Sequence, residues 1–165
     1  MEQIYPLFGF LLWFGLFIVF YTYIGYGILL YALVRIKELF KKRVALVLPE
    51  PLPDVTLFIA AYNEEDIISK KMENCRALSY PAGKLHIVWV TDGSNDHTNE
   101  RLAEYKDVTV LFNPERKGKT AALNRGMQYV TTPYVVFTDA NTMLNRDAIK
   151  EIVRCFSDPK VGCVE

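Results

Sequence analysis

Hydrophobic and polar residues follow two contrasting patterns along the chain. Residues 5–34 are almost wholly apolar and aromatic and contain no charged side chain. This run is longer than the roughly 20 residues that a helix needs to cross a bilayer. From residue 54 onward, short apolar runs alternate with segments whose apolar residues recur at helical spacing. The patterns predict one N-terminal transmembrane helix, residues 1–36, followed by an α/β domain, residues 54–165.

Basic residues cluster directly after the apolar run. No basic residue precedes the run, which is also too long for the core of a cleaved signal peptide, so we expect a membrane anchor. The positive-inside rule places the basic flank in the cytoplasm and the N-terminus outside, in the plasma (inner) membrane. We expect residues 35–47 to form an amphipathic helical tail along anionic lipid. The basic residues are Arg35, Lys37, Lys41, Lys42 and Arg43.

Three prolines, Pro49, Pro51 and Pro53, end any helix and predict a stiff, extended linker. Residues 37–53 are therefore interpreted as a basic juxtamembrane segment with a proline-rich linker that precedes the folded domain.

Strands and helices are expected to alternate strictly beyond the linker. Because the strands are continuously apolar, they predict a mostly parallel α/β sheet in three layers, of Rossmann-like type. The chain ends inside the last expected strand, so we expect a fragment of a longer protein. The expected strands are 55–61, 85–91, 108–112, 134–138 and 161–164, and the expected helices are 64–78, 96–106, 120–130 and 149–156.

Charge and cysteine content argue against nucleic-acid binding, a zinc site and a disulfide framework. The chain has 19 basic and 19 acidic side chains, so no bulk charge favours binding to nucleic acid. Cys75, Cys155 and Cys163 lack the paired spacing of a zinc site or a disulfide framework. They are typical of reduced residues in the cytosol.

Candidate chemistry is densest where the strand 134–138 ends. Side chains alternate along an extended chain, so Asp139 and Asn141 are expected to point the same way, with Ala140 turned aside. Carboxylate and carboxamide oxygens at the carboxyl end of a parallel strand suit a divalent cation, Mg²⁺ or Mn²⁺. The alternative is that Asp139 caps the following loop.

Two further loops follow expected strands. In the first, Asn63 is a candidate helix cap, with Glu64 and Glu65 complementing the helix dipole. In the second, Asp92 ends a buried strand and Gly93 allows the backbone to pass close to a ligand, so the carboxylate is a candidate acceptor for ribose hydroxyls or a base edge.

The remaining polar residues of the second loop have structural readings. Asp96 is expected to cap the following helix. Of the two histidines, His86 is interpreted as structural, and His97 as a solvated or loop-bracing residue rather than a phosphate ligand.

The third loop, residues 113–120, is basic and opens a helix. Lys117, Lys119 and the helix N-terminus form a cationic spot suited to diphosphate. The segment also approaches a P-loop, but Asn113 stands where that motif has its first glycine, and Pro114 follows it. A P-loop NTPase is therefore a second hypothesis, and a noncatalytic membrane-anchored binding module is a third.

Four segments, taken in order, resemble the nucleotide-binding half of family 2 glycosyltransferases of GT-A fold. They are I-A-A-Y-N-E-E, V-T-D-G-S-N-D-H-T, R-K-G-K-T-A-A-L-N-R-G and V-F-T-D-A-N-T. The resemblance covers residues 54–165. With the membrane span, the chain is similar to transferases of bacterial envelope and exopolysaccharide synthesis.

The resemblance implies a nucleotide-sugar donor, most naturally a UDP-sugar, and a lipid or glycan acceptor at the cytoplasmic membrane face. It implies metal binding by Asp139 and Asn141, although the family often has a second aspartate at the latter position. The general base and an acceptor segment of Q-x-x-R-W type would lie beyond Glu165, so this chain alone is expected to be inactive. The donor-binding residues implied are Tyr62, Glu64, Asp92, Gly93, Arg116, Lys119 and Asp139.

Overall fold

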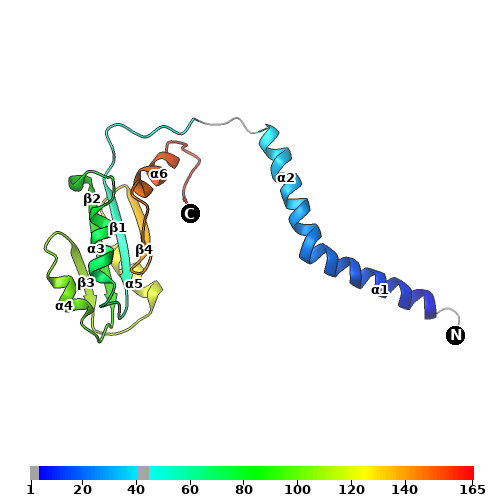
Figure 1. Ribbon diagram of the computed structural model, residues 1–165, viewed down its shortest axis with the longest axis horizontal. Helices are drawn as coiled ribbons and strands as arrows, with labels where there is room; N and C mark the ends of the chain where they lie inside the picture. The colour runs from blue at the N-terminus through cyan, green and yellow to red at the C-terminus, as the bar shows by residue number, and fades with distance from the viewer. Residues whose placement is uncertain (1–3, 41–44) are drawn as a thin grey trace. The chain divides into compact units, whose positions relative to one another are not determined.

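The computed structural model describes residues 4–40 and 45–165 (Figure 1). The chain divides into two compact units, Met1–Val44 and Ala45–Glu165. The predicted limits at residues 36 and 53 stay predictions, and the basic residues Lys41, Lys42 and Arg43 lie outside the described residues.

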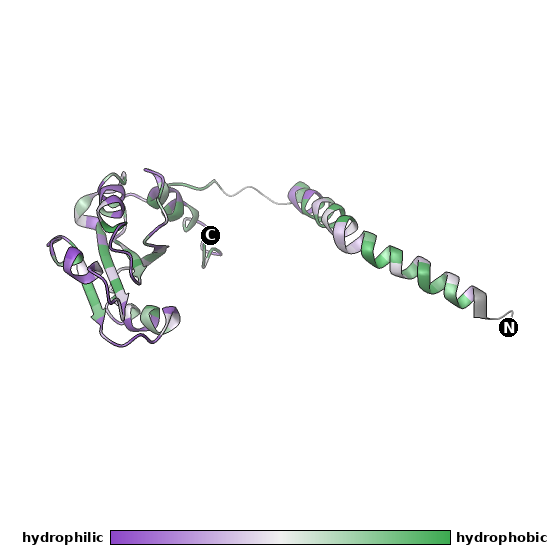
Figure 2. Ribbon diagram, turned by 60° about the horizontal axis from the view of Figure 1, so that its bottom comes forward, coloured by the Kyte–Doolittle hydropathy of each residue, from purple (hydrophilic) through white to green (hydrophobic). Residues whose placement is uncertain are grey.

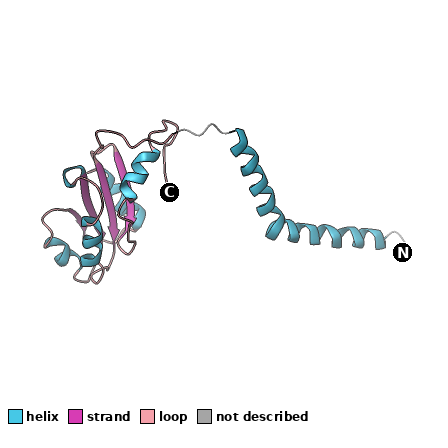
Figure 3. Ribbon diagram, turned by 45° about the horizontal axis from the view of Figure 1, so that its top comes forward, coloured by secondary structure: helices cyan, strands magenta, loops and turns pink. Residues whose placement is uncertain are grey.

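The first unit is a long apolar helix in three consecutive segments: α1 (Ile4–Phe20), a π-helical stretch η1 (Tyr21–Gly25) and α2 (Tyr26–Phe40). The stretch Pro6–Phe40 contains an 18-residue run with a mean hydropathy of 2.1 and is the one stretch within the described residues long and apolar enough to cross a membrane (Figure 2). The helix bends between α1 and α2 (Figures 1 and 3). A π-helical insertion is a recognised cause of such a bend.

The predicted helical tail is shorter than expected. α2 ends at Phe40, and residues 45–47 are not helical. Pro49 disfavours a helical conformation at Leu48, the residue before it. Instead, the Val47 N–H donates to the Ser157 hydroxyl at 3.2 Å.

The second unit is built on a parallel four-stranded sheet of order β3-β2-β1-β4. Because all four strands run the same way, their carboxyl ends meet at one end of the sheet. The register aligns Ala60 of β1 with Asp139 of β4, and Asp92 of β2 with Asn113 of β3. The strands are β1 (Val55–Ala61), β2 (Leu85–Asp92), β3 (Thr109–Asn113) and β4 (Tyr134–Asp139).

Helices cover both faces of this sheet, which confirms the predicted three-layer α/β architecture (Figure 3). One face packs against α3, α4 and α6 around Trp89 and Ile59. The other packs against α5 around Phe58 and Val90. The helices are α3 (Ile68–Arg76), the single-turn η2 (Ala82–Lys84), α4 (Thr98–Ala103), α5 (Lys119–Met127) and α6 (Ala148–Cys155).

Two boundary predictions are wrong in instructive ways. α3 begins at Ile68 rather than at residue 64, because the acidic residues before it contact a neighbouring loop instead of entering the helix. Residues 161–164 form no strand. An apolar run becomes a strand only where its backbone groups pair with another strand, and the described ladders include none for this segment.

Substituting Gly126 with alanine is expected to destabilise the second unit by about 1–3 kcal/mol, because the site is closely packed. An added Cβ would lie 2.3 Å from Cζ of the buried Phe58 and 2.7 Å from Cγ2 of Val90. Urea unfolding of the whole chain in detergent measures the loss. Gly83→Ala is the matched control, since open space surrounds that glycine. Equal stability of the two variants would contradict the packing argument.

Candidate active site

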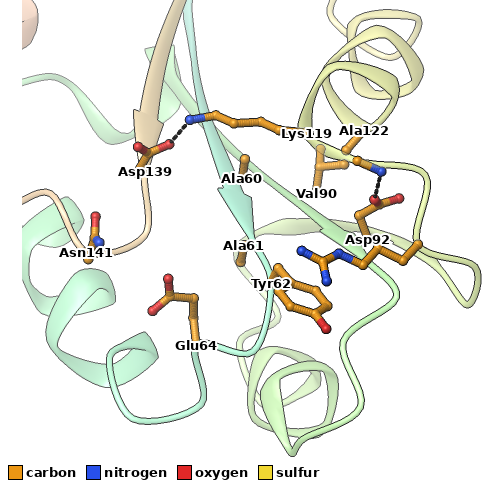
Figure 4. A pocket seen from close by; sticks show the side chains of 12 residues that line it. Ala60, Ala61, Tyr62, Glu64, Val90, Asp92, Lys119, Ala122, Asp139 and Asn141 are labelled. Atoms are coloured by element: carbon orange, nitrogen blue, oxygen red, sulfur yellow. Dashed lines mark hydrogen bonds and ion pairs between the residues drawn. The ribbon is translucent and has the colours of Figure 1, made fainter.

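The carboxyl ends of β1, β2 and β4 surround a cavity of about 210 Å³ (Figure 4). Asp92 and Asp139 lie on opposite sides of it, with Ala60 and Val90 between them. The cavity is where an open parallel sheet is expected to hold its ligand. Its predicted lining residues are Tyr62, Glu64, Asp92, Arg116, Lys119, Asp139 and Asn141. Gly93 is the one predicted site residue outside this lining, and the functions of all eight stay predictions.

Reciprocal hydrogen bonds join the first loop to the second. Asn63 Nδ2 donates to Asn95 Oδ1 at 2.7 Å, and the Asn95 N–H donates to Asn63 Oδ1 at 3.0 Å. Asn63 has a positive φ of 53° and caps no helix, so that prediction is wrong. The Glu64 N–H donates to Thr98 Oγ1 at 2.9 Å, which leaves the Glu64 side chain free to line the cavity.

Glu65 and His97 form a second brace between these loops. Glu65 Oε2 accepts from the His97 N–H at 2.8 Å and lies 3.1 Å from His97 Nδ1. His97 therefore braces the loop, as predicted. Glu65 does not complement the dipole of α3 as predicted, because it lies two residues before Ile67, the N-cap of α3, and its carboxylate contacts His97 at the start of α4 instead.

Asp96 caps the start of α4 and also contacts the first loop. Its carboxylate accepts from the Thr98 N–H at 3.0 Å and from the Glu65 N–H at 3.2 Å. Burial alone would raise the pKa of Asp96, but these hydrogen bonds favour the charged form and lower the pKa overall. The contribution of Asp96 to stability is thus present above the normal aspartate pKa and is lost as the pH falls through the lowered one.

Asp92 is buried and organises the third loop. Its Oδ2 accepts from the backbone N–H groups of Lys117 at 2.8 Å and Gly118 at 2.7 Å. Its Oδ1 has no hydrogen-bond partner among the described residues and lies 3.6 Å from Arg125 Nη1. One carboxylate oxygen therefore fixes the loop, and the other faces the Arg125 guanidinium.

Gly93 allows the second and third loops to approach closely. Its φ is +70°, and a Cβ there would lie 2.7 Å from the Arg116 backbone nitrogen. The close approach of Gly93 to a ligand stays a prediction, and in the structure this glycine lies against the third loop.

Arg116 and Tyr62 form a flat pair at the cavity. The guanidinium carbon lies 3.8 Å from the centroid of the tyrosine ring, within the range of a cation–π contact. Tyr62 is 37% exposed. The pair thus offers a planar, partly open surface from two different loops, beside the Asp92 end of the cavity.

Asp139 and Asn141 are presented by a turn at the end of β4. The Thr142 N–H donates to the Asp139 carbonyl at 3.2 Å, while Ala140 is buried in the core and both flanking side chains line the cavity. Lys119 Nζ lies 2.7 Å from Asp139 Oδ1, and both side chains are more than half exposed. The Asp139 carboxylate thus already attracts a cation, here an ammonium group.

The turn after β4 offers one carboxylate and one carboxamide to a divalent cation. Among the described residues, no group of three or more His, Cys, Asp or Glu side chains is placed to hold a metal. One carboxylate and one carboxamide suit a cation that completes its shell with water and phosphate oxygens, as Mg²⁺ and Mn²⁺ do.

Three polar residues that the sequence analysis did not select lie behind the site. Lys71, on α3, is fully buried, and its ammonium donates to Thr138 Oγ1 at 3.1 Å and to the Thr142 carbonyl. Burial lowers the pKa of Lys71, although Cys75 and Asp139 oppose that shift. Asn74 and Arg125 are the other two. A lysine at helical spacing between Ile68 and Cys75, on the apolar face of α3, was the available signal.

Comparison with known proteins identifies the family. Residues 56–164, about two thirds of the chain, match the model of Glycosyl transferase family 2. The chain belongs to glycosyl transferase family 2. This confirms the resemblance drawn from the four sequence segments.

Curated relatives of this family 2 chain are bacterial polysaccharide synthases. The chain is 34% identical over 161 residues, 95% of its length, to a poly-beta-1,6-N-acetyl-D-glucosamine synthase of Staphylococcus aureus (strain MSSA476). It is 30% identical over 164 residues to the synthase of the same name from Staphylococcus epidermidis. The chain spans 38% of the length of each of these relatives.

Solved structures share the fold of this family 2 chain. A mannosyltransferase, PcManGT from Pyrobaculum calidifontis, in complex with GDP-Man and Mn²⁺, superimposes with a TM-score of 0.70 at 32% identity. The match covers 89% of this chain and 46% of the other. TarS of S. aureus, in complex with UDP-GlcNAc, superimposes with a TM-score of 0.58 at 20% identity over 64% of this chain and 31% of the other, which shows the fold alone.

The geometry also explains why the third loop of this family 2 chain is not a P-loop. A P-loop turns its backbone N–H groups toward phosphate. Here the N–H groups of Lys117 and Gly118 donate to Asp92. The NTPase hypothesis is therefore dropped.

Proposed function

We propose that the whole protein transfers a sugar from a UDP-sugar to a lipid or glycan acceptor at the cytoplasmic membrane face, in envelope or exopolysaccharide synthesis. The chain described here would supply the donor site. The observation that carries the proposal is the cavity in which two acids from separate strand ends lie with cationic side chains between and beside them.

The Asp92 side of the cavity suits the nucleoside. The Asp92 carboxylate lines the cavity and would accept hydrogen bonds from a base edge or ribose hydroxyls, and the Tyr62–Arg116 pair offers a flat face for a base. A UDP-sugar is favoured because relatives that align along 95% of this chain are named as N-acetylglucosamine polymer synthases. Gly93 and Glu64 complete the donor site, the first by supporting Arg116 and the second by lining the cavity.

The Asp139 side suits the diphosphate and a divalent cation. Asp139 and Asn141 would hold Mg²⁺ or Mn²⁺, which neutralises charge on the departing diphosphate. Lys119 lies at the same place and provides a further positive charge for the phosphate oxygens. The structurally similar mannosyltransferase PcManGT, in complex with GDP-Man and Mn²⁺, supports this assignment.

The reaction follows from this placement of the donor. An acceptor hydroxyl attacks the anomeric carbon, the bond from that carbon to the diphosphate oxygen breaks, and a carboxylate outside this set takes the hydroxyl proton. The residues of this chain bind and orient the donor and stabilise the leaving diphosphate. The apolar helix Pro6–Phe40 would keep the site at the membrane, with the N-terminus outside.

Isothermal titration calorimetry on the whole chain in detergent tests the proposal. UDP is expected to bind, to bind about tenfold more tightly with Mn²⁺, and to bind more tightly than ATP or GDP do. Asp107→Ala is a suitable control, because this exposed acid pairs with Arg76 and precedes β3 at the opposite end of the sheet. UDP binding no stronger than ATP binding would contradict the donor assignment, and no nucleotide binding at all would favour a noncatalytic module.

A further inference from the structure

Lys71 is a buried cation whose hydrogen-bond acceptors are uncharged. The residue is 0% exposed, and its ammonium donates to the Thr138 hydroxyl and the Thr142 carbonyl. Removing an ammonium from water is costly unless its surroundings return most of that free energy. A hydrophobic residue of similar volume at such a buried position often gives the protein the same or a higher free energy of unfolding. The needs of the fold alone therefore do not account for a lysine here.

The two acceptors flank the turn that presents Asp139 and Asn141. Thr138 is the residue before the turn and Thr142 is its last residue, held by the hydrogen bond from the Thr142 N–H to the Asp139 carbonyl. A single ammonium thus joins the strand end to the far side of the turn. Asp139 and Asn141, which lie between, both line the cavity.

Asn74, one helical turn after Lys71 on α3, also holds the segment that follows β4. Asn74 Nδ2 donates to the Leu144 carbonyl at 2.8 Å, and the Leu144 N–H donates back to Asn74 Oδ1 at 2.9 Å. Positions 71 and 74 are three residues apart and so lie on the same side of the helix. α3 therefore holds residues 138–144 at two consecutive points from the face opposite α5.

We propose that Lys71 is a positioning residue for the cation end of the donor site. By joining Thr138 to Thr142, it fixes the turn in the one shape in which the Asp139 carboxylate and the Asn141 carboxamide face the same cation. The inference rests on the proposed function, since it assigns a role toward the cation and diphosphate. Lys71 lies behind the turn, lines no part of the cavity and contacts no reacting group.

The test compares Lys71→Met with Lys70→Met, the adjacent and exposed lysine of the same helix. UDP affinity of the whole chain in detergent is measured by calorimetry with and without Mn²⁺, and thermal unfolding is measured without ligand. In Lys71→Met, the strengthening by Mn²⁺ is expected to fall from about tenfold to about twofold or less. UDP affinity without metal and the unfolding temperature are expected to stay at or above the wild-type values. Lys70→Met is expected to match wild type in all three.

Thr138→Val provides a second variant, because it removes one acceptor without emptying the space. Thr138→Val is expected to reduce the strengthening of UDP binding by Mn²⁺, but by less than Lys71→Met does. A Mn²⁺ effect of wild-type size in both variants would overturn the inference and leave the proposed function standing. A lower unfolding temperature together with an unchanged Mn²⁺ effect would show a merely structural lysine. No Mn²⁺ effect in the wild type would overturn the metal assignment itself.

Discussion

Replacing Asp92 with alanine is expected to reduce UDP affinity by about 100-fold or more, the largest effect we anticipate. The change removes a carboxylate from the cavity lining and releases the N–H groups of Lys117 and Gly118, which position the third loop. It also leaves the Arg125 guanidinium without its carboxylate, and breaking such a buried pair costs on the order of 3 kcal/mol. Calorimetry with UDP and urea unfolding measure the two losses.

Asp92→Asn separates the two contributions. It keeps the volume and one oxygen of the side chain but deletes the charge that faces Arg125. We expect a folded chain with UDP binding weakened by at least about tenfold, equivalent to about 1.4 kcal/mol. If Asp92→Asn folds and binds UDP as tightly as the Asp107→Ala control, Asp92 is not a donor ligand.

The second large effect is expected at Asp139. Asp139→Asn retains the size of the side chain and removes the only carboxylate of the proposed cation pair, so the strengthening of UDP binding by Mn²⁺ is expected to fall from about tenfold to none. UDP affinity without metal should change little or rise, because Lys119 loses its ion pair and becomes available to the diphosphate. Calorimetry with and without Mn²⁺ measures both quantities.

Lys119→Met is the complementary variant. It is expected to weaken UDP binding without metal and to leave Asp139 more accessible to Mn²⁺, so that the metal effect grows. A metal effect that survives in Asp139→Asn would place the cation elsewhere in the cavity. Since Asp139 is more than half exposed, neither change is expected to alter stability by more than about 1 kcal/mol.

The strands and their carboxyl-end acids were predictable from the sequence because they depend on local patterns. An apolar run such as Val55–Ala61 indicates a buried parallel strand, and Asp92 and Asp139 are recognisable as the acids that end two such runs. The convergence of their side chains follows from parallel topology alone.

The contacts between loops were not predictable in the same way. Asn63 and Glu65 have the local appearance of helix-capping residues, yet their partners Asn95 and His97 lie 32 residues further along the chain. The local sequence indicates that these residues can cap a helix, but it does not show the contacts with a distant loop, which form only once the sheet has folded. The start of α3 was therefore placed four residues too early.

The buried lysine shows a different limit. Lys71 falls on the apolar face of α3, and a sequence pattern reads a lysine there as a break in amphipathicity rather than as a hydrogen-bond donor. Its role becomes visible only once β4 and the turn after it are seen packed against the helix.

The position of β4 at the edge of the sheet has a practical consequence. Among the described residues its only ladder neighbour is β1, and Phe137 on this strand is 51% exposed. The unpaired amide and carbonyl groups of an edge strand, here next to an aromatic side chain, form a template to which another strand can add. Concentrated samples of this polypeptide are therefore expected to self-associate through intermolecular strand pairing, and a peptide that pairs with β4 is expected to keep them monodisperse.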